Sequence, residues 1–516
     1  MSPASTNPAS REGLNRGIVT AAVMLATIMQ TLDSTIANVA LPHMQGSFSV
    51  AQDEVTWVLT SYIVAAAIGT PLTGWLASNY GTKRLLLGSM AGFTVASVLC
   101  GLAGSIEQMV AFRFLQGLCG AALVPLAQAM LLDIYPREKA GGAMAIWGAG
   151  VMLGPIIGPT LGGYLTDAYN WRWVFYINVP VGIVAFLVLA SFARESQTHR
   201  RGFDFFGFAM LSLAVGALQL MLDRGEYKDW LAANEIRVEL GIALAAFWVF
   251  LVHSATSSNP FVSLVLFKDR NFSSGNILMF LISVVILAST ALLPTFLQVV
   301  LNYPVVTAGV LMTPRGFGTV FSMLLVGKLT NRFDSRLLML IGFAVSAYSF
   351  WMPHDWTIDM GWQPIALAGI GQGFGMGMIF VPLSLVTFGT LPQVYRNEAT
   401  ALFSLVRNVG GSIGISIAEN YLSRATQTTH QAIAANVTPF NQALHDPAVS
   451  GTWNIHSTAG LSALNYEVTR QASMIAYLDC FELMAIICAV MIPLLLIMRQ
   501  VRQPPGQGGG AHAAAE

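Results

Sequence analysis

A carboxylate stands in the middle of an apolar run near the start of the chain. Asp33 lies in the segment 30–38, which reads QTLDSTIAN. At helical spacing Gln30, Asp33, Ala37 and Asn38 share roughly one face, and this polar stripe should look into protein or a wet cavity. Desolvation and a nearby cation shift the pKa of a carboxyl in opposite directions, so such a group can carry a proton. A buried hydrogen-bonded brace is the alternative interpretation.

Three of the 26 basic residues also lie inside apolar runs: Arg113, Arg315 and Arg407. A charge at such a position costs on the order of 3 kcal/mol on insertion scales, so each needs a partner or a function. Arg113 is the expected partner of Asp33, because it is the one fixed cation deep in the first six apolar runs. Its counterpart in the internal repeat described below, near Ile370, is apolar. Asp33 and Arg113 are therefore the predicted proton-coupling pair.

The remaining buried or half-buried charges are less specific. Arg315 stands between a proline and a glycine, where a broken helix could supply carbonyls, and a structural brace explains it and Arg407 at least as well as a function. Three acids lie toward the ends of the last two apolar runs, where snorkelling and a proton entry route are both open interpretations. They are Glu419, Asp479 and Glu482.

The elements that must position these charges are apolar runs of about 17 to 25 residues, the length that crosses roughly 30 Å of hydrocarbon. The chain is 54% hydrophobic and only 10% charged, which favours a membrane protein over soluble domains. We count fourteen runs, at residues 18–42, 55–77, 85–105, 108–132, 141–165, 172–193, 204–222, 236–254, 272–300, 307–329, 336–352, 362–390, 399–421 and 475–498. The predicted fold is all-α with fourteen transmembrane helices.

Basic residues between the runs predict the orientation. Seventeen Lys and Arg fall on the segments assigned to the inner side and six on the outer side, which places both termini in the cytoplasm. We expect a cytoplasmic segment at 1–17, a long periplasmic loop at 422–474 and a disordered tail at 503–516.

An internal repeat divides the chain. Gln116-Gly117 reappears as Gln372-Gly373, at an offset of 256 residues. Six spans are therefore duplicated, in bundles at 18–193 and 272–498, and the pair at 204–254 is inserted between them. Repeated bundles of this kind build alternating-access transporters.

Glycines recur every four residues at 150, 154, 158 and 162, with Pro155 and Pro159 beside them. This ridge predicts close packing of two helices and permits bending. No P-loop and no HExxH sequence occurs, so the chain has no ATPase or zinc-protease motif of its own. We expect no enzymatic activity, no metal and no cofactor, with a proton gradient as the source of energy.

Several longer stretches resemble the major facilitator superfamily, in its fourteen-span drug:proton antiporter branch. They are LDSTIANVALP at 32–42, RFLQG at 113–117, the glycine-rich stretch 150–163, and WRWVFYINVP at 171–180. The segment LDRGE at 222–226, the long outer loop and the tail are similar to those of the EmrB-like exporters of Gram-negative bacteria. One stretch differs: GWLASNYGTK at 74–83 lacks the acid and two bases that the family usually has there.

The resemblance implies proton-driven antiport that exports lipophilic, often cationic, drugs and toxic compounds across the inner membrane. It implies two partners, a periplasmic EmrA-like adaptor and an outer-membrane TolC-like channel. It also assigns an antiporter motif (Gly150, Gly154, Pro155, Gly158, Pro159, Gly162 and Gly163) and an inner gate (Gly74, Gly81 and Lys83). We expect the substrate cavity to be mostly apolar, because adaptable side chains suit promiscuous binding, and to be lined by Gln30, Asn38, Gln116, Gln128 and Trp147.

Two other functions stay open at this point. One is export of a single metabolite or siderophore, and the other is a membrane sensor or scaffold that does not transport.

Overall fold

The computed structural model describes residues 8–196, 198, 202–330, 332–438, 441, 444, 453–455 and 457–499. The predicted tail at 503–516 lies outside this range. Throughout the described part the secondary structure is helical, without strands. Its α-helices are α1 (Pro8–Phe48), α2 (Gln52–Tyr80), α3 (Thr82–Leu102), α4 (Ile106–Gly120), α5 (Leu123–Ile134), α6 (Arg137–Ala168), α7 (Trp173–Tyr176), α8 (Asn178–Phe192), α9 (Phe205–Arg224), α10 (Asn234–Thr256), α11 (Arg270–Thr295), α12 (Val305–Leu329), α13 (Ser335–Trp351), α14 (Trp362–Gly389), α15 (Arg396–Ala434) and α17 (Thr458–Leu494).

The fourteen predicted spans are confirmed. Within the described ranges, thirteen helical segments are long and apolar enough to cross a membrane, and the bent helix α6 makes fourteen. Helices α4 and α5 form one span, interrupted close to Pro125, which has no N–H to continue the hydrogen-bond ladder. Helix α6 bends by 40° between Pro155 and Ile157, where two prolines loosen the same ladder.

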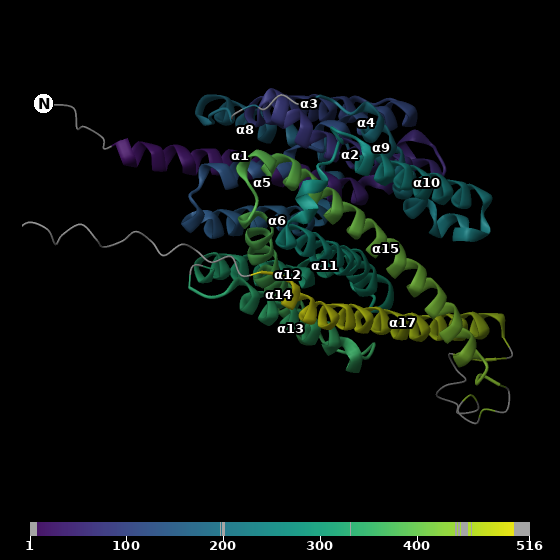
Figure 1. Ribbon diagram of the computed structural model, residues 1–516. Helices are drawn as coiled ribbons and strands as arrows, with labels where there is room; N and C mark the ends of the chain where they lie inside the picture. Colours follow the sequence, from purple (N-terminus) through teal and green to yellow (C-terminus); the bar gives the residue numbers. More distant parts are fainter. Residues whose placement is uncertain are drawn as a thin grey trace, which may run out of the picture.

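Two bundles lie side by side, with α1 to α8 in one and α11 to α17 in the other (Figure 1). The inserted helix α9 packs on α2 and also contacts α15, and α10 packs on α9. The repeat is visible in the packing. A Cβ atom on Gly117 would collide with the backbone oxygen of Tyr62 in α2, and one on Gly373 with that of Arg315 in α12. The glycine of each Gln-Gly pair therefore makes the same kind of close contact between two helices of its own bundle.

Much of the predicted periplasmic loop at 422–474 is helical. Helix α15 continues to Ala434 and α17 begins at Thr458. The 39 residues of α15 span about 58 Å, nearly twice the thickness of the hydrocarbon. No proline or glycine interrupts residues 422–434, and Leu464 and Val468 of α17 pack with Ile433 of α15. The two helices form a hairpin that extends past the ends of α11 and α13 (Figure 1, lower right).

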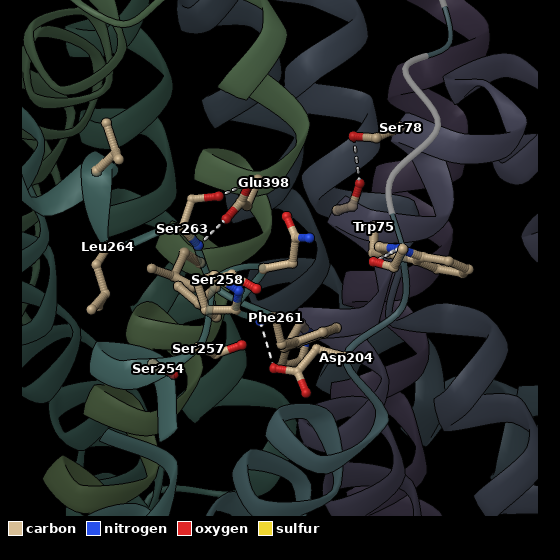
Figure 2. A pocket seen from close by; sticks show the side chains of 18 of the residues that line it. Trp75, Ser78, Asp204, Ser254, Ser257, Ser258, Phe261, Ser263, Leu264 and Glu398 are labelled. Carbon is tan, nitrogen blue, oxygen red and sulfur yellow. Dashed lines mark hydrogen bonds between the residues drawn. The ribbon is translucent and has the colours of Figure 1, made fainter. Parts of the chain in front are cut away.

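A polar pocket of about 750 Å³ lies where the inserted pair joins the bundles (Figure 2). Its walls come from α2, from the segments that flank α9 and α10, and from the start of α15. The Glu398 carboxylate of α15 accepts the Ser263 N–H at 2.5 Å and the Ser263 hydroxyl at 3.1 Å. Asp204 links the start of α9 to the segment after α10, because its carboxylate accepts the N–H groups of Gly207 and Phe261, each at 2.9 Å.

Asp204 also contacts the His253 ring at 2.9 Å, so it joins both ends of the inserted pair. Burial disfavours the charge of this carboxylate, but its hydrogen bonds from Gly207, His253 and Phe261 outweigh that effect and lower the pKa below its ordinary value. A lowered pKa means that Asp204 stabilises the fold above the pKa of the unfolded chain. This contribution is lost as the pH falls through the lower pKa of the folded state.

Asp204→Asn should therefore lower the melting temperature at neutral pH. The difference in melting temperature between the variant and the unchanged protein should become smaller as the pH falls below 4. An asparagine keeps one acceptor oxygen but loses the charge that three donors share. Thermal unfolding in detergent between neutral and acidic pH measures this. Asp359→Asn, at an exposed position, is the matched control, and equal shifts in both variants at every pH would contradict the role of Asp204.

Candidate functional site

Asp33 and Arg113 form a fully buried ion pair. Arg113 Nη1 lies 2.7 Å from Asp33 Oδ2, and both residues are 0% exposed. The predicted pairing is therefore present, although a role in proton transfer stays a prediction. Helix α1 supplies the acid and α4 the base, and the Arg113 Nε donates to the Val58 carbonyl of α2 at 3.1 Å. The pair thus joins three helices of the first bundle.

A network of amides surrounds this pair. Gln116 Nε2 and Asn178 Nδ2 donate to Asp33 Oδ1 at 2.9 and 2.8 Å, and both also donate to the hydroxyl of Ser97. Asp33 thus accepts three strong donors. These bonds occupy three of the roughly four acceptor positions of a carboxylate, whereas protonation of a carboxyl removes its charge and leaves its hydroxyl oxygen a weaker acceptor. The hydrogen bonds to Asp33 thus join α1 to α4 and α8.

Asn178 and Ser97 were missed by the sequence analysis. Asn178 lies in the stretch 171–180 that resembles the family, and this resemblance was the available signal for it. Ser97 carries no such signal, since a serine on an apolar helix is common. Tyr62 was missed too. Its ring covers the Arg113 guanidinium at 4.2 Å, and its hydroxyl accepts a hydrogen bond from Gln30 at 3.1 Å.

Tyr62 and Gln30 form part of the wall of a central cavity of about 280 Å³ between the bundles. The walls are mostly apolar, as predicted, and come from both bundles and from Gln219 of α9. Tyr62 therefore separates the cavity on one side from the buried pair on the other.

Of the five side chains predicted to line the cavity, only Gln30 does so. Gln116 instead belongs to the Asp33 network. Asn38 is exposed, because it stands eight residues along α1 from Gln30 and beyond the cavity. Gln128 and Trp147 are fully buried, and the Trp147 ring stacks on Phe380 of the other bundle at 5.7 Å. Helical periodicity could not separate cavity walls from packed interior.

Among the described residues that line the cavity, Arg407 of α15 is the one with a charged side chain. Its Nη1 is shielded from solvent and has no hydrogen-bond partner, and no described acid lies within ion-pair distance. Arg315 likewise has a buried Nη1 without a partner, but among the described residues its Nη2 donates to the Ser289 hydroxyl at 2.8 Å, and Arg315 does not line the cavity. The structure thus separates two arginines that the sequence treated alike.

The three acids near the ends of the last spans stay apart from the Asp33 network. Glu419 is exposed, and Asp479 and Glu482 are partly exposed. Glu482 lies 3.9 Å from the His354 ring. None of the three lines the central cavity.

The predicted antiporter motif lies against the helix that carries Asp33. A Cβ atom on Gly154 would stand 2.7 Å from the Leu32 backbone nitrogen, and one on Gly162 would stand 3.0 Å from the Ile36 carbonyl oxygen. Gly150 and Gly158 face the side chains of Met24 and Thr35 on the same helix. The glycine ridge of α6 therefore packs closely against α1 both before and after Asp33 in the sequence.

Gly154→Val should destabilise the protein by about 1–3 kcal/mol, because α1 offers backbone rather than a flexible side chain at this contact. Thermal unfolding in detergent measures the loss. Gly163→Ala is the matched control, since its nearest neighbour, Val39 Cγ1, lies 3.9 Å from the added carbon. A neutral Gly154→Val would mean that α1 and α6 separate freely.

The predicted inner gate lies at a contact between the two bundles. A Cβ atom on Gly74 would stand 2.8 Å from the Glu398 Cα, so α2 and α15 touch there. Glu195 accepts the N–H groups of Lys83 and Arg84 at 2.9 and 3.1 Å, and the Lys83 ammonium donates to the Ala190 carbonyl. Glu195, from the segment after α8, thus supplies a carboxylate at the end of the stretch 74–83.

Gly81 has a φ of 97°, which favours glycine, and the Glu195 carboxylate fills the space beside it. Arg396 closes the same end, because it donates to Asp133 of the first bundle at 2.7 Å. Across the described part of the chain, no group of three or more His, Cys, Asp or Glu is arranged to hold a metal ion.

Comparison with known proteins decides the family. The sequence profile described as "Major Facilitator Superfamily" matches residues 23–415. The chain belongs to the major facilitator superfamily. Among superfamily members, it is 36% identical to "Multidrug export protein EmrB" of Escherichia coli (strain K12), over 97% of this chain and 99% of that one. It is also 36% identical to "Fatty acid resistance protein FarB" of Neisseria gonorrhoeae, over 96% and 97%.

The superfamily fold is seen in solved structures as well. The human organic anion transporter MFSD10 matches with a TM-score of 0.61 at 13% identity, over 93% of this chain and 99% of that one. The recognition of an EmrB-like member of the superfamily is therefore confirmed, as is the predicted multi-pass protein of the bacterial inner membrane.

Proposed function

We propose that this protein exports lipophilic drugs and toxic compounds in exchange for protons. The observation that supports it best is the Asp33–Arg113 pair, a titratable group buried at 0% exposure behind the wall of a central cavity. Full-length similarity to an exporter named for multidrug export supports the substrate class.

In the proposed cycle, a proton from the outer side neutralises Asp33. The neutral carboxyl accepts the three donors more weakly, and Arg113 loses its counter-ion, so the packing of α1, α2 and α4 changes. The contact between α1 and the glycine ridge of α6 then shifts, and the inner gate opens. Inward movement of one charge down the membrane potential supplies about 2.3 kcal/mol per 100 mV, in addition to the pH gradient.

Arg407 bears on which compounds fit. It gives the cavity an unpaired positive charge and no acid among its described lining residues, which disfavours the expected cationic compounds. We infer that lipophilic compounds with an acidic group are preferred, since their anion would supply the missing partner of Arg407.

The partners of this transporter are part of the proposal. Similarity to EmrB over nearly the whole chain favours an EmrA-like adaptor and a TolC-like channel. The hairpin of α15 and α17 extends past the bilayer on the predicted outer side and is the surface that we assign to the adaptor. Co-purification of an EmrA-like protein with the full chain, and its loss when residues 430–460 are shortened to a tight turn, tests this assignment.

Export itself is tested in proteoliposomes. Purified protein should move a fluorescent lipophilic acid when a pH gradient is imposed, and collapse of the gradient should stop that movement. Chemically unrelated acids should compete with one another. If a single compound is moved, the protein is a specific exporter. If none crosses, a sensor or scaffold is favoured and the proposal fails.

A further inference from the structure

A second cavity lies on the outside of the first bundle, apart from the transport cavity. It is a crevice of about 670 Å³ between α2 and α4, bordered by Leu220 of the inserted helix α9. It shares no lining residue with the central cavity. Its other residues come from one face of α2 and one face of α4: Glu54, Trp57, Ser61 and Val64, and Ile106, Glu107, Val110, Ala111 and Phe114.

The crevice has a charged mouth and an apolar interior. Glu54 and Glu107 stand in the first turns of α2 and α4, both exposed, and none of the described residues that line the crevice is basic. Trp57 and Phe114 are 40% and 41% exposed on its walls. From Glu54 to Val64 the lining runs along about 15 Å of helix, which is roughly one leaflet of the bilayer.

One polar group inside the crevice has no partner. Ser61 is 94% buried, and its hydroxyl makes no hydrogen bond, although it lines the crevice below the two acids. A buried hydroxyl without a partner is costly, so the wall of the crevice is not optimised for packing within this chain alone. This observation is independent of the two carboxylates, one of which also caps its own helix through the Ala51 N–H.

The nearest basic group does not neutralise the mouth. The Arg224 guanidinium lies 5.9 Å from the Trp57 ring, but it pairs with Glu235 and Glu239 at 2.8 and 2.7 Å. Its charge is thereby already balanced by two acids outside the crevice. The mouth keeps its negative charge, which is opposite in sign to that of Arg407 in the central cavity.

We propose that this crevice is a lateral binding site for cationic amphiphiles, which enter from the bilayer. The ammonium group lies between Glu54 and Glu107, and the apolar part lies along Trp57, Val64 and Phe114. An aromatic wall suits such a cation as well as the carboxylates do. The site is separate from the exchange of acids for protons and does not depend on it.

Quenching of tryptophan fluorescence tests the proposal with the full chain in nanodiscs of zwitterionic lipid. The probe is (4-bromododecyl)trimethylammonium, whose bromine lies near the head group and so near Trp57, and 4-bromododecyl sulfate is the anionic counterpart of equal chain length. Subtraction of the Trp57→Phe signal isolates Trp57. The cation should quench the Trp57 fluorescence saturably. Half-maximal quenching by the sulfate should require a concentration at least about tenfold higher, the preference expected from two exposed contacts between a carboxylate and a cation.

Glu54→Gln/Glu107→Gln should abolish this tenfold preference. The matched control, Asp355→Asn/Asp359→Asn, removes two exposed acids elsewhere and should leave the preference unchanged. Equal quenching by both probes would show a groove for any acyl chain and overturn the proposal. A preference that survives the double Gln variant would overturn it too. Because no gradient is present, these outcomes are independent of whether export is proton-driven.

Discussion

Asp33→Asn should abolish export driven by a pH gradient, with a loss of at least about a hundredfold, the scale on which removal of a proton-transfer group acts. Asparagine has nearly the shape of aspartate and can still accept from one amide. It cannot take up a proton, so the exchange has no group to couple to. Efflux from proteoliposomes under an imposed pH gradient measures this effect.

This substitution also leaves Arg113 buried without a counter-ion, which can cost about 3–5 kcal/mol and unfold the protein. The double variant Asp33→Asn/Arg113→Gln removes both charges and keeps a neutral, hydrogen-bonding interior. We expect it to fold, to bind fluorescent substrate and to remain uncoupled. Asp359→Asn, an exposed acid outside the membrane spans, is the matched control. Normal pH-driven efflux in the folded double variant would exclude Asp33 as the proton carrier.

Arg407→Gln should reduce transport of lipophilic acids by about tenfold to a hundredfold, the range expected for loss of one charge-assisted hydrogen bond in a shielded site. Neutral dyes of similar size should be transported at nearly the original rate. Paired efflux measurements on an acid and its methyl ester separate the two effects.

Two further variants sharpen this result. Arg407→Lys keeps the charge and should retain part of the preference for acids. Arg315→Gln removes a similarly placed arginine whose Nη2 contacts Ser289 outside the cavity, and should change both substrates equally. If Arg407→Gln lowers transport of the acid and the ester alike, Arg407 is a structural brace.

The length and number of the spans could be predicted from the sequence because the bilayer imposes both. About 20 apolar residues are needed for each crossing, whatever the neighbouring helices do. The pairing of Asp33 with Arg113 could also be predicted, since a buried charge must find an opposite one and the first six spans offer a single cation.

The hairpin of α15 and α17 could not be predicted in the same way. Residues 422–434 are polar, and outside the bilayer a polar segment can be a loop or a helix. What decides is the packing of Leu464 and Val468 against Ile433, a contact between segments some 30 residues apart in the chain.

The sequence alone therefore determined the membrane class, the fourteen spans and the identity of the buried charges. The free energy of moving a residue out of water depends mainly on its own type, so these features do not require knowledge of the neighbouring helices. Only the tertiary structure decided that Tyr62 separates Arg113 from the cavity, that Asn178 and Ser97 complete the Asp33 network, and that Arg407 rather than Arg315 faces the cavity. These facts depend on how each helix is rotated about its own axis relative to helices far away in the sequence. The hydrophobic periodicity of a single helix does not specify that rotation.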